Sequence, residues 1–198
     1  MIPVAQQPEP HEFDKRVRQP GKAFLAANPS KKPRNFWNRA IDHLHKAYEG
    51  ICAYTCVYIP HQGSVDHFLP QSRYRDLAYE WSNYRLATEK VNSHKGESTD
   101  IIDPFIVQKG WFVIDFPSCL IRPALGLSQG IAEQVEKTTR ISKLNTYDYF
   151  VQERCDIVID FLDGHMSFAY LSRRYPFLAA EISRQGGKEA LGAIFRRP

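Results

Sequence analysis

The sequence predicts an α+β fold in three parts, because proline content, apolar spacing and turn residues change along the chain. Six of the thirteen prolines lie between residues 1 and 34, which favours an extended arm over a packed element. From Gly126 onward, apolar residues recur at helical spacing. We therefore predict a Pro-rich basic arm over 1–35, a small mixed core over 36–100, and a β-hairpin followed by a mostly helical lobe over 101–198.

The arm carries an uneven charge within a chain of 198 residues whose formal net charge is +4. Between Lys15 and Arg39 there are eight Lys or Arg residues and no Asp or Glu. Such a segment can follow a polyanion by releasing its counterions. It is equally well interpreted as a solvated tail without a partner, and charge alone does not separate the two.

In the core, a helix over 36–49 is predicted by apolar residues that recur after three or four positions. These residues are Trp37, Ile41, Leu44 and Tyr48. Gly50 is a natural stop for this helix. The β-branched and aromatic residues over 51–59 favour a strand or a strand-like turn, and a short apolar segment, Val65–Leu69, ends at Pro70.

A further helix is predicted from Ser82 or Asn83 to about Ser93, with Gly96 just beyond its end. Two short strands, over 105–107 and 111–116, are expected around a turn at 108–110. The later spacing predicts one helix over 131–141 and a second that starts after Asn145 or Thr146 and is broken at Asp163-Gly164. Two or three shorter helices complete the predicted lobe.

Composition indicates the cellular compartment in which the protein is expected. Four cysteines are too few to indicate a disulfide framework in a chain of this size. The prolines after Met1 argue against a signal helix, and the sequence has no uncharged apolar stretch long enough to span a membrane. We expect a soluble, cytoplasmic protein in a reducing compartment, without membrane contact.

The dipeptide Asp66-His67 is the first candidate for chemistry. Neighbouring residues of a strand point to opposite sides, and in-line attack on phosphorus needs help on two sides. A histidine can act as the base for the incoming water, and a carboxylate is a natural ligand for Mg²⁺ or Mn²⁺. An Asp-His pair alone is weak support for such a site.

Two asparagines nine positions apart, Asn83 and Asn92, follow this pair. On one continuous helix they would lie on opposite faces, so only one could face an ion while the other fixed the loop after His67. Lys95 shares the face of Asn92 and could meet a phosphate. The plainer interpretation is that Asn83 caps the helix and Asn92 lies at its end.

Taken together, the run from Asp66 to Gly96 resembles the HNH endonuclease (ββα-metal) family. The family signature is an Asp-His or His-His pair, a central Asn, and a final His or Asn about nine residues later, matched here by Asp66-His67, Asn83 and Asn92. Lys95-Gly96 stands where the family often has a basic residue and a glycine. The resemblance covers about residues 50 to 96.

The resemblance implies a role for each of these residues. Asp66 and Asn92 would hold one divalent cation, Mg²⁺ or Mn²⁺, His67 would activate water, and Asn83 would pin the connecting loop. Many members also hold a structural zinc with two CxxC pairs. Here Cys52 and Cys56 have CxxxC spacing and Thr88 and Val91 replace the second pair, so no structural zinc is expected.

The resemblance also implies partners. Double-stranded DNA is the expected substrate, with structured or single-stranded nucleic acid as the alternative. Contact is expected mainly through the phosphates, because no helix carries residues spaced to read base edges. The basic residues expected to contact it are Arg73, Arg75, Arg85, Lys90 and Lys95. The order of the three parts is similar to that of small HNH subunits of bacterial antiphage systems, such as Septu, which work beside an ATPase. The alternative is a nucleic-acid-binding or assembly subunit without catalysis.

Overall fold

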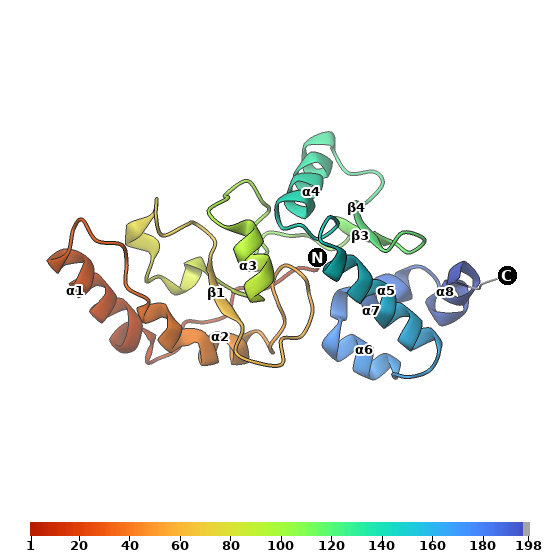
Figure 1. Ribbon diagram of the computed structural model, residues 1–198, viewed down its shortest axis with the longest axis horizontal. Helices are drawn as coiled ribbons and strands as arrows, with labels where there is room; N and C mark the ends of the chain where they lie inside the picture. The colour runs from red at the N-terminus through yellow and green to blue at the C-terminus, as the bar shows by residue number, and fades with distance from the viewer. Residues whose placement is uncertain (196–198) are drawn as a thin grey trace.

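The computed structural model describes residues 1–195 as a mixed α+β protein that is mostly helical. Two small antiparallel hairpins lie between groups of helices (Figure 1). The amino-terminal helices lie at one end of the long axis and helices α5 to α8 at the other, with β1 and α3 between them. Over residues 1–195, no helix is both long and apolar enough to cross a membrane.

The amino-terminal arm is helical and packed, so the prediction of an extended arm over 1–35 is wrong for its middle part. A π-helical turn, η1 (Asp14–Arg18), leads directly into α1 (Gln19–Ala27). Phe13, Val17 and Gly21 are buried and follow one another at four-residue steps, which places them on one helical face. Pro20 stands in the first turn of α1, where its missing N–H is tolerated.

The helix predicted over 36–49 forms in two parts. A 3₁₀ turn, η2 (Phe36–Ala40), precedes α2 (Ile41–Ala47), and Gly50 lies just beyond them with a positive φ of 70°. Of the strand or strand-like turn predicted over 51–59, the turn is confirmed: residues 53–55 form a turn between Ile51 and Tyr58, which pair in one isolated bridge. The intervening residues make a tight loop that donates a hydrogen bond from Ala53 N to Leu86 O at 2.8 Å.

The core hairpin pairs β1 (Ser64–His67) with β2 (Tyr84–Ala87) in antiparallel register. Two short 3₁₀ turns, η3 (Arg75–Leu77) and η4 (Trp81–Asn83), lie in the connection. The chain then enters α3 (Glu89–Lys95), whose cap Thr88 accepts a hydrogen bond from Val91 N. The helix predicted from Ser82 or Asn83 to Ser93 is therefore wrong in its first half, where every residue of β2 is buried.

The second hairpin is formed by β3 (Phe112–Asp115) and β4 (Leu120–Pro123). The predicted strand over 105–107 does not form, because β3 pairs with the segment that follows it and not with the one before it. Glu181 joins this hairpin to the helical lobe. Its buried carboxylate accepts a hydrogen bond from Ile114 N at 2.9 Å and ion-pairs with Arg184.

The helical lobe agrees with the prediction from apolar spacing. Its helices are α4 (Gln129–Ile141), α5 (Asp148–Leu162), α6 (Phe168–Arg174), α7 (Pro176–Arg184) and α8 (Gly187–Phe195). Val135, Val158 and Leu171 are fully buried within this lobe. The predicted break at Asp163-Gly164 is confirmed, since α5 ends at Leu162.

We predict that Gly21→Ala destabilises the protein, because α1 touches the ring of Tyr79 at this position. A Cβ on Gly21 would lie 2.4 Å from the Tyr79 ring, which is itself fully buried. Such overpacking should lower the free energy of unfolding by about 1–3 kcal/mol, measured by urea denaturation.

Gly130→Ala is the matched control within α4. A Cβ at that exposed position meets nothing within 4 Å, and alanine should raise stability by about 0.5–1 kcal/mol. Equal unfolding free energies for Gly21→Ala and the parent would show that α1 does not lie against Tyr79.

Candidate functional site

His67 ends strand β1 and is held between two aromatic rings. Its ring centroid lies 4.7 Å from that of Trp37 and 5.1 Å from that of Tyr84, both edge-on. Its Nε2 lies 2.9 Å from the carbonyl oxygen of Ala78. Because a carbonyl oxygen only accepts, Nε2 carries the hydrogen and Nδ1 keeps a lone pair in the neutral ring.

Burial sets the protonation state of this histidine. The side chain is only 8% exposed, and desolvation lowers the pKa of His67 below its ordinary value. The bond to Ala78 O acts in the opposite direction and is the smaller effect. The imidazole is therefore neutral at neutral pH, which is the form that a general base needs.

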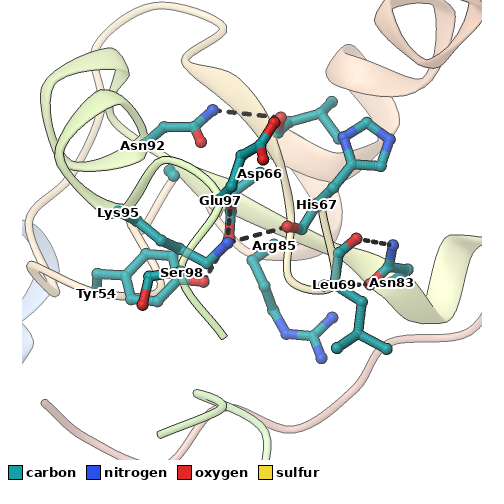
Figure 2. Close-up of polar contacts among 12 residues, drawn as sticks. Tyr54, Asp66, His67, Leu69, Asn83, Arg85, Asn92, Lys95, Glu97 and Ser98 are labelled. Carbon is teal, nitrogen blue, oxygen red and sulfur yellow. Dashed lines mark hydrogen bonds and ion pairs between the residues drawn. The ribbon is translucent and has the colours of Figure 1, made fainter. Parts of the chain in front are cut away.

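Asn83 fixes the loop that supplies the Ala78 carbonyl. Its Oδ1 accepts from Leu69 N at 2.8 Å, and its Nδ2 donates to Leu69 O at 3.0 Å and to Leu77 O at 3.2 Å. The carboxamide thus joins the two ends of the connection between β1 and β2 (Figure 2). The contacts agree with the loop-pinning role predicted for Asn83, although it lies in the turn before a strand and not on a helix.

Asp66 points away from His67 into a buried polar cluster. Lys95 Nζ lies 2.9 Å from its Oδ1 and also donates to His67 O at 3.0 Å. The hydroxyl of Tyr54 donates to Oδ2. The side chains of Lys95 and Asp66 are 0% and 2% exposed, so the ion pair is sealed from water (Figure 2).

Tyr54 belongs to the loop that carries Cys52 and Cys56. Burial and the neighbouring Asp66 carboxylate raise the pKa of Tyr54 well above its ordinary value, so it remains a neutral donor. Both cysteines are buried, and their sulfur atoms accept hydrogen bonds from Thr55 N and Ile2 N respectively. The loop therefore serves to hold the tyrosine against β1.

Asn92 lies against the start of β1, one helical turn before Lys95. Its Nδ2 donates to Ser64 Oγ at 3.1 Å and to Val65 O at 3.3 Å. Helix α3 therefore presents two polar side chains to one strand. Asn92 contacts residues 64 and 65, whereas Lys95 contacts residues 66 and 67.

These residues do not fit a divalent cation in the arrangement that the structure describes. Both oxygens of Asp66 already accept from Lys95 or Tyr54 in a sealed interior, whereas Mg²⁺ retains several water ligands. Within the described part of the chain, no three His, Cys, Asp or Glu side chains are grouped to hold a metal. The structure brings Asp66 and Asn92 to one strand but gives the carboxylate an ammonium as its counter-ion.

The five basic residues expected to contact nucleic acid fall into two groups. Arg85 is 3% exposed and forms a bidentate ion pair with Asp103, at 2.6 and 2.8 Å, while its guanidinium lies 3.5 Å from the Phe105 ring centroid. Arg85 and Lys95 are therefore internal, and their predicted contact with DNA phosphates does not agree with their burial.

The remaining three basic residues are less buried: Arg73 and Lys90 are exposed, and Arg75 is half-buried. Arg73 donates to Glu97 O, and Arg75 donates to the carbonyls of Lys31 and Asn28. Lys90 is exposed, with its ammonium 3.4 Å from the ring centroid of Tyr149. These residues can still contact a polyanion.

Sequence reasoning missed three parts of the site: the Ala78 carbonyl, the ring of Trp37 beside His67, and the Tyr54 hydroxyl. A backbone carbonyl carries no sequence signal. The sequence pattern places Trp37 on an apolar helix face and Tyr54 in the aromatic segment 51–59. Their contacts with residues 67 and 66 form over long sequence separations, which the pattern does not indicate.

We predict that Asn83→Asp destabilises the connection between β1 and β2, residues 68–83, which we call the site loop. A carboxylate would face the carbonyl oxygens of Leu69 and Leu77, to which Nδ2 now donates. The loss should be about 3 kcal/mol of unfolding free energy, measured by urea denaturation at neutral pH. The control Asn38→Asp, at an exposed position, should change stability by less than about 0.5 kcal/mol. Similar effects of the two substitutions would contradict the loop-pinning role.

In comparisons with known proteins, no family model and no curated protein matches this chain. The resemblance to HNH endonucleases therefore depends on the residues between Asp66 and Gly96 and on how they lie. Function follows from them as a proposal.

Proposed function

We propose that this protein is an HNH-type endonuclease that hydrolyses phosphodiester bonds of DNA, with His67 as its general base. The observation that carries the proposal is the hydrogen bond from His67 Nε2 to Ala78 O at 2.9 Å. It orients the ring and leaves Nδ1 as the basic nitrogen. Asn83 supports this assignment because it fixes the loop to which Ala78 belongs.

In the proposed reaction, His67 Nδ1 takes a proton from water as the water oxygen forms a bond to phosphorus. The bond from phosphorus to the 3′ oxygen breaks, and that oxygen takes up a proton from solvent. The products then carry a 5′ phosphate and a 3′ hydroxyl, as the resemblance implies. The requirement for Mg²⁺ or Mn²⁺ stays a prediction, because Asp66 and Asn92 as arranged do not fit a cation.

DNA is the proposed substrate because exposed basic residues lie on both sides of Trp37, the residue whose ring contacts His67. Lys31, Lys32, Arg34 and Arg39 are exposed, and they flank Trp37, whose ring contacts His67. The guanidinium of Arg75 donates to the carbonyl of Lys31, which holds this segment against the site loop. Phosphate contact through such residues gives binding that weakens with salt and carries little sequence preference.

A second function, nucleic-acid binding or assembly without cleavage, is favoured by one observation. The Asp66 carboxylate is sealed by Lys95 and Tyr54 and offers no oxygen to a ligand. In that case the hairpin and α3 would be a scaffold. The helical lobe, where Phe168, Tyr170 and Ile194 are exposed, would be the proposed contact for the ATPase partner that the resemblance implies.

We predict that His67→Gln reduces nicking of supercoiled plasmid by roughly 10² to 10⁴, the usual contribution of a positioned general base. A glutamine amide can still donate to Ala78 O, so the loop should keep its position. Rates should be compared with Mg²⁺, with Mn²⁺ and with EDTA, and thermal melts should confirm that the variant is folded.

The matched control is His165→Ala, at an exposed position in the helical lobe. This variant should nick at the parental rate. If His67→Gln nicks as fast as the parent, His67 is not the base. Salt-sensitive retardation of the plasmid without cleavage under every metal condition would favour the binding subunit.

A further inference from the structure

We infer that Lys95 is a built-in cation of the Asp66 carboxylate, so that its ammonium closes this site to a divalent metal until the lysine is displaced. Lys95 would thereby regulate the proposed nuclease site, a role that rests on the proposed function. Its test uses metal binding and does not require cleavage.

The Lys95 ammonium lies in a position lined by oxygen atoms. Nζ is 2.9 Å from Asp66 Oδ1 and 3.0 Å from His67 O, so a carboxylate and a main-chain carbonyl both face it (Figure 2). These are the oxygen types that hard cations select. The charge requirement of this position is therefore met by a side chain of the protein itself.

Burial makes this ion pair difficult to exchange for a metal. The two side chains are sealed from water. In the interior of a protein, opposite charges attract more strongly than at the surface. Tyr54 holds the second oxygen of Asp66, so the carboxylate cannot turn a free oxygen outward without breaking that bond as well. A metal ion must therefore compete with both partners.

The position of Lys95 in α3 indicates what has to move. Lys95 is the last residue of a seven-residue helix, and Gly96 follows it with a positive φ of 52°. Lys95 is fully buried and makes two hydrogen bonds, so both must break when its ammonium is withdrawn. Unwinding the last turn would withdraw the ammonium, while Asn92, one turn earlier, could keep its contacts with Ser64 and Val65.

The test is Mn²⁺ binding, followed by the loss of the electron paramagnetic resonance signal of free Mn²⁺. In the parent protein, Asp66 should not be a ligand, so Asp66→Asn should leave Mn²⁺ affinity unchanged. Lys95→Met removes the ammonium with little change of volume. It should raise Mn²⁺ affinity on the order of tenfold or more, the scale of a modest electrostatic competition.

The double variant Lys95→Met with Asp66→Asn should lose this gain, which assigns the new affinity to the carboxylate. Lys95→Gln serves as the second variant if Lys95→Met fails to fold. Its neutral amide can still donate to Asp66 and His67 O, and the same gain is expected.

Two results would overturn the inference: parental Mn²⁺ binding that Asp66→Asn abolishes, or a folded Lys95 variant with parental affinity. If both Lys95 variants unfold, Asp66→Asn is compared with the parent after thermal melts have shown it to be folded, because this variant leaves the buried Lys95 ammonium without its counter-ion. Nicking that depends on His67, together with parental Mn²⁺ binding through Asp66, would keep the proposed function and reject the inference. Absence of nicking, with the predicted gain in Mn²⁺ affinity, would do the reverse.

Discussion

The alternation of side chains along β1 is the constraint on which the rest of the site depends. In four residues, the strand sends Asp66 towards Tyr54 and α3, and His67 towards Trp37 and the site loop. Antiparallel pairing with β2 fixes this division, because a shift by one residue would exchange the two faces. Each face then acquires its own partners from distant parts of the chain.

The two faces of β1 differ in the chemistry that their side chains allow. The His67 face holds a neutral imidazole between rings, with one nitrogen committed to a carbonyl. The Asp66 face holds an ion pair in the interior, in which Lys95 Nζ donates to Asp66 Oδ1 and to His67 O. The first arrangement favours acid–base chemistry, whereas the second is a stable end point that resembles structural ion pairs elsewhere in proteins. A nuclease interpretation therefore requires that the second face can rearrange.

Local features of this site could be predicted from the sequence, while its long-range contacts could not. The opposite directions of Asp66 and His67 follow from strand geometry, and the loop-pinning contacts of Asn83 agree with its place in the motif. The sequence predicts that Lys95 meets a phosphate, because it shares a helical face with Asn92, whereas the structure buries Lys95 with a carboxylate as its partner. Its partner, Asp66, is 29 residues away, and that separation carries no periodic signal.

The errors in the fold have physical causes of the same kind. Proline content indicates an extended arm. Instead, Phe13, Val17 and Gly21 form a buried helical face, which packs against aromatic residues such as Tyr79 and Tyr84. Residues 84–87 were assigned to a helix because they lie between a possible cap and a glycine. Burial on both sides, supplied by neighbours such as Phe13 against Tyr84, makes them a strand instead.

The packing of Gly21 against Tyr79 has a consequence for how this protein can be divided. Tyr79 directly follows Ala78, so α1 packs on the ring of the residue next to the carbonyl that orients the imidazole. A shortened chain that started at Phe36 would keep Asp66, His67, Asn83 and Asn92 and still lose the contact between α1 and Tyr79. The minimal unit able to hold His67 in place therefore extends well upstream of the motif by which the site is recognised.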